Sequence, residues 1–143
     1  MPYLADIDYR SQIKDEIINN VINTDVSLRL DMESKAEAQM RSRLAIRYDV
    51  TTIFNQTGAN RNAEIVMYYI DMVIYHLHSR ISGGQIPQTR IDRYNEAMNW
   101  LDKVAAGSYL PQNLPQIIDA DGDGTSDGNV VQSGSRAARD PYF

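Results

Sequence analysis

A chain of 143 residues is long enough to bury one hydrophobic core, and its 43% of apolar residues is close to the average for globular domains. The formal net charge of −5 argues against a broad surface that neutralises phosphates, because such a surface needs clustered Lys and Arg. The chain has no Cys, which excludes disulfides, thiolate nucleophiles and zinc–thiolate sites.

The N-terminal sequence and the most apolar stretch both argue against a secretory or membrane role. Residues 1–6 contain neither a basic n-region nor an apolar h-region, so we expect no secretion signal. Residues 65–77 are the most apolar stretch, but they include Asp71 and His76 and fall short of the roughly 20 residues that span a bilayer. This stretch predicts a buried helix, and we expect no membrane partner.

Hydrophobic spacing predicts a mainly α protein: a four- to five-helix bundle with one long helix and an extended C-terminal arm. Residues 5–24 predict one or two short helices. After a break at 23–25, Ser27 is the expected N-cap of the long helix, which runs to Tyr48 and spans about 33 Å at 1.5 Å per residue.

The long helix carries an apolar stripe that winds around it. Its larger side chains recur at every fourth residue, namely Leu28, Met32, Ala36, Met40, Leu44 and Tyr48. Because four residues turn a helix by about 400°, the stripe drifts by about 40° per step, and one straight neighbour cannot cover it. Either the helix bends around its own core, or its two ends face different partners.

Two arginines near the end of the long helix are candidate interface residues. Arg43 and Arg47 lie one turn apart, with Arg41 to the side. Arginine suits interfacial ion pairs, so the two side chains form either a solvated face or a patch that meets an acidic neighbouring subunit. The second alternative predicts that the chain joins a ring through the ends of the 27–48 helix.

Two further helices are expected before the composition changes. Residues 49–60 predict a short extended piece and a loop, with Asn60 or Asn62 as the cap of the next helix. That helix, at 62–81, is apolar nearly all round and should lie at the centre of the bundle. The last helix, at 87–106, has an apolar stripe with 3-4-3-4 spacing and ends at a glycine.

The domain boundary is expected after this last helix. Residues 1–110 should form the helical domain, and residues 111–143, with their Pro residues and Asp/Gly-rich loop, an extended C-terminal arm. The arm ends in Tyr142 and Phe143, aromatic residues suited to an interface. We expect the arm to dock outside its own helical domain, on another subunit or on a partner protein.

The sequence contains no recognisable catalytic motif, and we predict that the protein is not an enzyme. It has no phosphate-binding Gly-Lys-Ser/Thr loop, no Gly-x-Ser-x-Gly elbow and no His-Glu-x-x-His. His76 and His78 point to different sides of a helix and are expected to be structural. Asp71 is either a carboxyl with a shifted pKa or, as is commoner, an exposed or arginine-paired side chain.

An Asp-rich segment of the arm resembles part of a calcium loop. The candidate ligands are Asp119, Asp121, Asp123, the carbonyl of Thr125, and Asp127. Oxygen ligands at this spacing favour Ca²⁺, and Gly124 permits the sharp turn. Val130 stands where the bidentate Glu is required, and no helix is evident on either side, so a weak calcium site and a flexible acidic tether are both open.

Three stretches together resemble the Mu-like prophage family of small head–tail connector (head-completion) proteins of tailed bacteriophages. They are Pro2-Tyr3-Leu4 before an acidic short helix, the Ala-rich helix of residues 36–48 that ends in Arg47-Tyr48, and the pattern Arg-Tyr-x-x-Ala-x-x-Trp-Leu-x-x-Val-Ala-x-Gly over 93–107. The resemblance covers roughly residues 2–110, and the Asp-rich segment departs from the family's short forms.

The resemblance implies a structural virion protein of the neck, made in the host cytoplasm and without an active site. It would form a twelvefold homo-oligomeric ring beneath the portal protein, in contact with tail or neck proteins. The C-terminal arm would dock on another subunit or on the portal protein. DNA would pass through without specific binding, since an acidic lumen repels it. The alternative, which the Asp-rich loop suggests, is a calcium-dependent helical protein-binding module of a bacterial surface or secreted complex.

Overall fold

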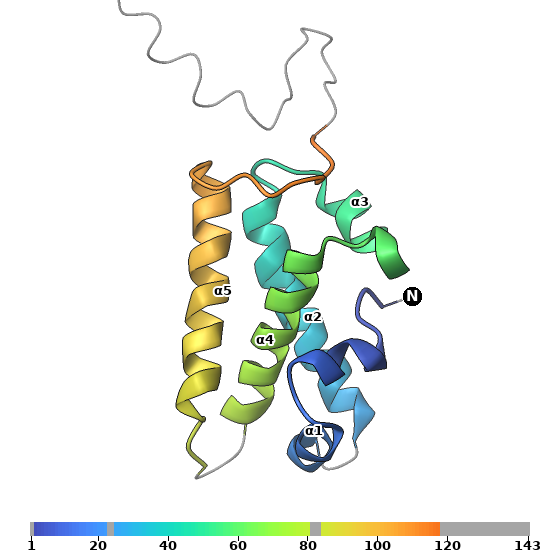
Figure 1. The fold of residues 1–143 in the computed structure, drawn as a ribbon, viewed down its shortest axis with the longest axis vertical. Coiled ribbons are helices and arrows are strands. Elements are labelled where there is room, and N and C mark those ends of the chain that lie inside the picture. Colours follow the sequence, from blue (N-terminus) through green and yellow to red (C-terminus); the bar gives the residue numbers. More distant parts are fainter. Residues whose placement is uncertain (1, 23–24, 81–83, 118–143) are drawn as a thin grey trace, which may run out of the picture.

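The computed structural model describes residues 2–22, 25–80 and 84–117. Within this part of the chain the elements are, in order, η1 (Asp6–Ser11), α1 (Asp15–Ile22), α2 (Val26–Leu44), α3 (Val50–Asn55), η2 (Gly58–Asn60), α4 (Ala63–Ser79) and α5 (Gln88–Ala106), where η denotes a 3-10 helix. They form the mainly helical bundle that the sequence predicts (Figure 1).

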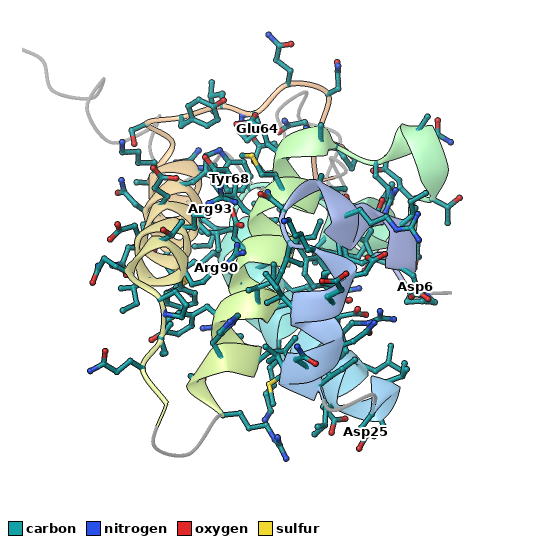
Figure 2. All side chains as sticks on the ribbon, turned by 60° about the horizontal axis from the view of Figure 1, so that its bottom comes forward. Asp6, Asp25, Glu64, Tyr68, Arg90 and Arg93 are labelled. Carbon is teal, nitrogen blue, oxygen red and sulfur yellow. The ribbon has the colours of Figure 1, made fainter. Side chains whose placement is uncertain are left out.

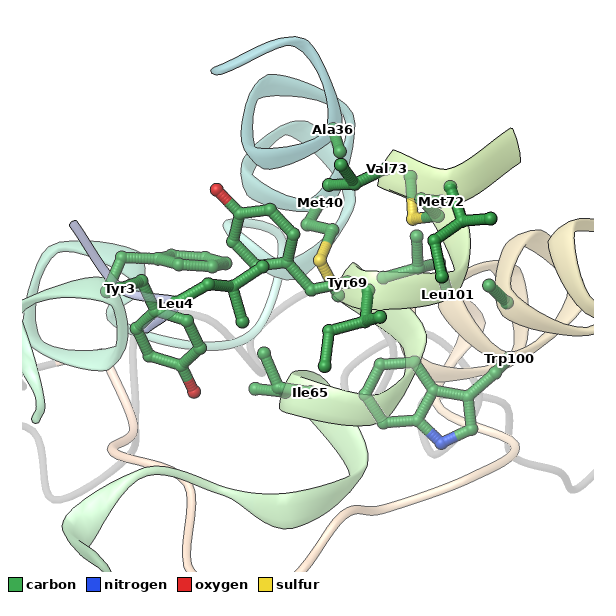
Figure 3. Packing of buried hydrophobic residues seen from close by; sticks show 14 of the residues in the cluster. Tyr3, Leu4, Ala36, Met40, Ile65, Tyr69, Met72, Val73, Trp100 and Leu101 are labelled. Carbon is green, nitrogen blue, oxygen red and sulfur yellow. The ribbon is translucent and has the colours of Figure 1, made fainter. Parts of the chain in front are cut away.

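Helix α4 is the centre of the bundle, as its apolar composition predicts. It contacts η1, α1, α2 and α5, and most of its second half is buried. Figure 3 shows Tyr69 on the side of α4 that faces Tyr3 and Met40, with Leu101 and Trp100 of α5 on the other side. A helix that is apolar nearly all round is stable in water only when other elements cover it in this way.

The winding stripe of α2 is covered by different elements of the same chain. Near its start, α2 contacts α1, and Arg29 binds Asp6 of η1. Farther along, Ala36, Met40 and Leu44 are fully buried, and α2 contacts α4 and α5. The described elements that cover the stripe all belong to the same chain, and a contact with another subunit at one end of the helix stays a prediction.

Two local predictions about helix ends are wrong. The N-cap of α2 is Asp25 and not Ser27, because the Asp25 carboxylate accepts hydrogen bonds from the Ser27 backbone N–H (3.0 Å) and hydroxyl (2.6 Å). The helix also ends at Leu44, and the chain turns before it reaches Tyr48.

Residues 50–55, predicted as an extended piece, form the helix α3. The Asp49 carboxylate caps it by accepting a hydrogen bond from the Thr52 backbone N–H at 3.2 Å. Ile53 and Phe54 are buried at 0% and 4% exposure, so core packing overrides the extended preference of the β-branched residues at 50–53. The cap of α4 is Asn62, one of the two predicted candidates.

The segment after α5 runs across one end of the bundle toward α3 (Figure 1). Pro111 and Leu114 are buried there, and the Asp49 backbone N–H donates to the Pro115 carbonyl at 2.9 Å. An antiparallel bridge joins Tyr48 to Gln116. Residues 111–117, assigned to the arm from the sequence, therefore pack on their own helical domain.

The first residues of the chain are fastened by one arginine. Arg61 donates to the Tyr3 carbonyl at 2.8 Å and to both carboxylate oxygens of Asp8, at 2.6 and 3.1 Å. Tyr3 and Leu4 are buried at 4% and 3% exposure, and the Tyr3 ring packs on Phe54 and Tyr69. The N-terminal segment is thus part of the core.

Candidate assembly surfaces

The two predicted interface arginines both reach from α2 to α5. Arg43 Nε donates to Asp102 Oδ1 at 2.9 Å, in an ion pair whose carboxylate is largely exposed. Arg47 Nε donates to the Ala105 carbonyl at 3.1 Å. These contacts account for the positions of both side chains within one chain, and their role between subunits stays a prediction.

The Arg47 guanidinium also lies over the glycine that ends α5. Gly107 has φ 80°, the left-handed conformation of a helix C-terminus. A Cβ built on Gly107 would lie 2.5 Å from Arg47 Nη2 and 2.7 Å from Cζ. A side chain at this position therefore conflicts with both the backbone conformation and the arginine.

Large apolar side chains are exposed near both ends of α2. Val26 and Leu30, in its first turns, are 51% and 46% exposed. Ile46, just beyond its last turn, is 51% exposed, and Ile7 and Ile17 are exposed on η1 and α1. Exposed apolar side chains that gather in one region are typical of protein–protein contacts.

The buried residue Glu33 connects three elements of the bundle through an arginine and tyrosines. Glu33 accepts a hydrogen bond from the Tyr9 hydroxyl at 2.6 Å and lies 3.3 Å from Arg29 Nε, and burial raises its pKa. The Tyr69 hydroxyl donates to the Glu33 carbonyl at 2.9 Å. This network joins η1, α2 and α4, which makes it a structural feature.

Asp71 is buried at 5% exposure and lies 3.7 Å from Arg93 Nη1, a distance of an ion pair and not of a hydrogen bond. Burial raises its pKa to about 6, although Arg93 and Arg90 oppose that shift. Both arginines also donate to Gln12, which ties the η1–α1 connection to α5. Of the alternatives for Asp71, the exposed position is wrong, and pairing and a shifted pKa both hold.

The histidines make contacts inside the bundle. His76 Nε2 lies 2.7 Å from Gln39 Oε1, and His78 Nδ1 lies 2.9 Å from the Ile74 carbonyl. Burial lowers the pKa of His76, and the charge of Lys35 lowers it further. Within residues 2–117, as far as the structure describes them, no three His, Asp or Glu side chains are grouped as a metal ion requires.

A pocket that sequence reasoning missed lies between α4 and α5, with a volume of about 350 Å³. Its lining residues are Glu64, Tyr68, Glu96, Asn99, Trp100, Lys103 and Tyr109. Figure 2 shows Glu64, Tyr68, Arg93 and Arg90 in this order along the face that the two helices share. The signal in the sequence is an acid four residues before an aromatic residue on each helix, since such pairs share one helix face.

Glu64 is the polar centre of this pocket. Its carboxylate accepts hydrogen bonds from Trp100 Nε1 at 3.2 Å and from the Tyr109 hydroxyl at 2.9 Å. The rings of Tyr68 and Trp100 lie 5.0 Å apart between centroids, and those of Trp100 and Tyr109 6.2 Å apart. An acidic group enclosed by aromatic rings is an arrangement that attracts a cation.

Several predicted site residues lie outside the described part of the chain. They are the candidate calcium ligands Asp119, Asp121, Asp123, Thr125 and Asp127, and the aromatic residues Tyr142 and Phe143. Among the described helices, none combines the length and apolarity that crossing a membrane requires.

Comparison with known proteins identifies the family. The model of a family described as "Bacteriophage Mu, Gp36" matches residues 4–132. No curated protein and no solved structure matches the chain. Because the family match spans most of the sequence, this chain belongs to the bacteriophage Mu Gp36 family and is a phage protein.

Proposed function

We propose that this protein is a structural subunit of the virion neck, which forms a ring between the portal and the tail and completes the head. Membership of a bacteriophage Mu family supports a phage role, and the helical bundle fits a structural subunit. The observation that carries the ring is the exposure of apolar side chains near both ends of α2, at Val26 and Leu30 and at Ile46.

Two different surfaces of one subunit can close a ring. When the surface at one end of a helix meets the surface at the other end in the next copy, the contact is heterologous, and repeated rotation closes a cyclic assembly. Arg43, close to Ile46, would then add a charged contact beside an apolar one. The ring is expected to be twelvefold, with the portal on one side and tail or neck proteins on the other.

The net charge agrees with DNA passing through such a ring. A charge of −5 per subunit repels the phosphate backbone, so DNA would cross the lumen without being held. The calcium-dependent alternative has no support in the family match, and its ligands lie outside the described residues.

The test is made in phage particles that carry variants of this protein. Leu30→Glu and Val26→Glu place a charge in the proposed contact and should increase the fraction of heads without tails, counted by electron microscopy. Met67→Glu is the matched control, because Met67 is also an exposed apolar residue (39%) but lies on α4. Equal tailing of all three variants, with the protein incorporated, would contradict the proposed contact.

The position of the protein is tested separately by electron microscopy of the neck. Averaged density at the head–tail junction should contain a ring of helical subunits into which this bundle fits. If labelled protein is found elsewhere in the particle, or in no particle at all, the proposed function is wrong.

A further inference from the structure

We propose that the pocket between α4 and α5 binds an arginine side chain from residues 136–139 of a neighbouring copy of this protein. The contact would join subunits of the ring, so this inference rests on the proposed function and specifies one of its interfaces.

The pocket carries negative charge that the described part of the chain leaves without a cationic partner. Glu64 and Glu96 both line it, and neither forms an ion pair with any residue that the structure describes. Elsewhere in the bundle the common arrangement is a carboxylate that meets an arginine, as in Asp8, Glu33, Glu37, Asp71 and Asp102. A guanidinium is therefore the group expected to pair with the two carboxylates of this pocket, as arginines pair with carboxylates elsewhere in the bundle.

The aromatic rings make the pocket suited to arginine in particular. Tyr68 is half-buried and Tyr109 is 39% exposed, so both offer ring surface beside the Glu64 carboxylate. A planar guanidinium stacks on aromatic faces while its N–H groups bind a carboxylate. Glu64 is already held in place by Trp100 and Tyr109, and an ionised carboxylate has lone pairs left for further donors.

The electrostatic environment of Tyr68 agrees with a negative pocket. Its pKa is raised, first by burial and then by the charges of Glu64 and Glu96. Lys103 also lines the pocket; it is exposed and forms no ion pair with the described residues. The lining of the pocket thus contains two acids and one base, so its formal charge is negative.

The segment 136–139 carries the complementary charge. Arg136 and Arg139 are the only basic residues after residue 117, and Asp140 follows the second of them. An arginine of this segment that enters the pocket would meet Glu64 and Glu96. The intervening Ala137 and Ala138 are small and do not hinder the approach.

The chain geometry allows this segment to reach another subunit. Residues 107–117 cross the end of the bundle at which Tyr109 lines the pocket (Figure 1). Eighteen residues lie between Ile117 and Arg136, and a fully extended chain of that length spans up to about 60 Å. That reach exceeds the roughly 10–12 Å diameter of a single helix several times over.

The experiment uses Trp100, the only tryptophan of the chain, as a reporter inside the pocket. The acceptor is the full-length R136Q/R139Q variant, whose own tail cannot supply the arginine. A synthetic peptide of residues 132–143 should change its tryptophan emission in a saturable way. The same peptide with both arginines replaced by glutamine should bind at least tenfold more weakly.

Variants of the pocket decide whether the peptide binds there. Glu96→Gln in the acceptor should weaken the wild-type peptide several-fold, and Glu64→Gln more strongly. Circular dichroism confirms that each variant is folded. If both peptides act equally, or if neither changes the emission up to millimolar concentration, the pocket does not bind these arginines and the inference is wrong.

Mixing two full-length variants tests whether the contact joins different molecules. Trp100→Phe removes the reporter but leaves the tail intact, so it should change the emission of the R136Q/R139Q acceptor when the two are mixed. An effect of the peptide without an effect of Trp100→Phe would overturn the assignment to a neighbouring copy. A ring seen in the virion neck would leave the proposed function standing in that case.

Discussion

Replacing Gly107 by alanine tests the junction between the end of α5 and Arg47. Two costs are expected. An L-residue in the left-handed conformation, here φ 80°, costs roughly 1–2 kcal/mol. The new Cβ would also lie 2.5 Å from Arg47 Nη2, so the arginine must move and weaken its 3.1 Å hydrogen bond to the Ala105 carbonyl.

The second cost can be estimated and isolated. A hydrogen bond to a charged group contributes about 1.5–3 kcal/mol, and part of this is recovered because Arg47 is only partly buried. We therefore expect Gly107→Ala to lower the free energy of unfolding by about 2–4 kcal/mol in total. Gly58→Ala is the matched control, because Gly58 has φ 58° but nothing within 4 Å of its added Cβ.

Urea denaturation followed by circular dichroism measures both variants. Gly58→Ala should cost only the conformational term, so that the difference between the two variants, about 1–2 kcal/mol, reports the Arg47 contact. Equal costs would show that Arg47 moves aside freely and that its contact with the end of α5 contributes little. If Gly107→Ala removes the Arg47 contact as expected, Arg47→Ala in the Gly107→Ala background should lower the free energy of unfolding no further.

Three other predictions concern a buried acid and the C-terminal residues. In the folded protein the pKa of Asp71 is raised to about 6, above its ordinary value of 3.8, so its charge destabilises the fold at neutral pH. The stability of the wild type relative to Asp71→Asn should therefore rise as pH falls from 7 to 4, and a difference that stays constant with pH would contradict this. Calorimetry should show weak calcium binding, with a Kd of about 10⁻⁴–10⁻³ M, that Asp121→Ala abolishes, whereas no heat from either protein would leave the acidic tether. Deleting residues 132–143 should preserve the helical circular dichroism but reduce incorporation into particles, and normal incorporation would make this segment dispensable.

Helices with a complete local signal could be predicted from the sequence. For α5, a regular stripe and a terminal glycine agree with the observed bounds Gln88–Ala106, and for α4 an apolar run after an asparagine cap gives Ala63–Ser79. In each case the local pattern and the tertiary packing favour the same structure, which is the condition for a reliable inference from sequence.

Features that depend on contacts between distant residues could not be predicted. Helix α3 forms from β-branched residues because Ile53 and Phe54 enter the core, and nothing in residues 50–55 alone indicates that burial. Arg47 donates to the backbone carbonyl of Ala105, 58 residues away. Because every residue has a backbone carbonyl, the sequence does not indicate which one an arginine will bind. The pocket around Glu64 likewise exists only because α4 and α5 pack in a particular register.

The clip between Tyr48–Asp49 and Pro115–Gln116 determines how the domain would respond to a mechanical pull on its C-terminal side. Tension transmitted through Ile117 would act first on the 2.9 Å hydrogen bond between the Asp49 N–H and the Pro115 carbonyl, and on the adjacent bridge. While that clip holds, force enters the bundle beside α3 and the end of α2, and the C-terminus of α5 stays unstressed. Its rupture would pass the force to the buried Leu114 and Pro111 and to the hydrogen bonds of Gln112 with Asn62 and of Tyr109 with Glu64, which hold the rest of the segment on the bundle.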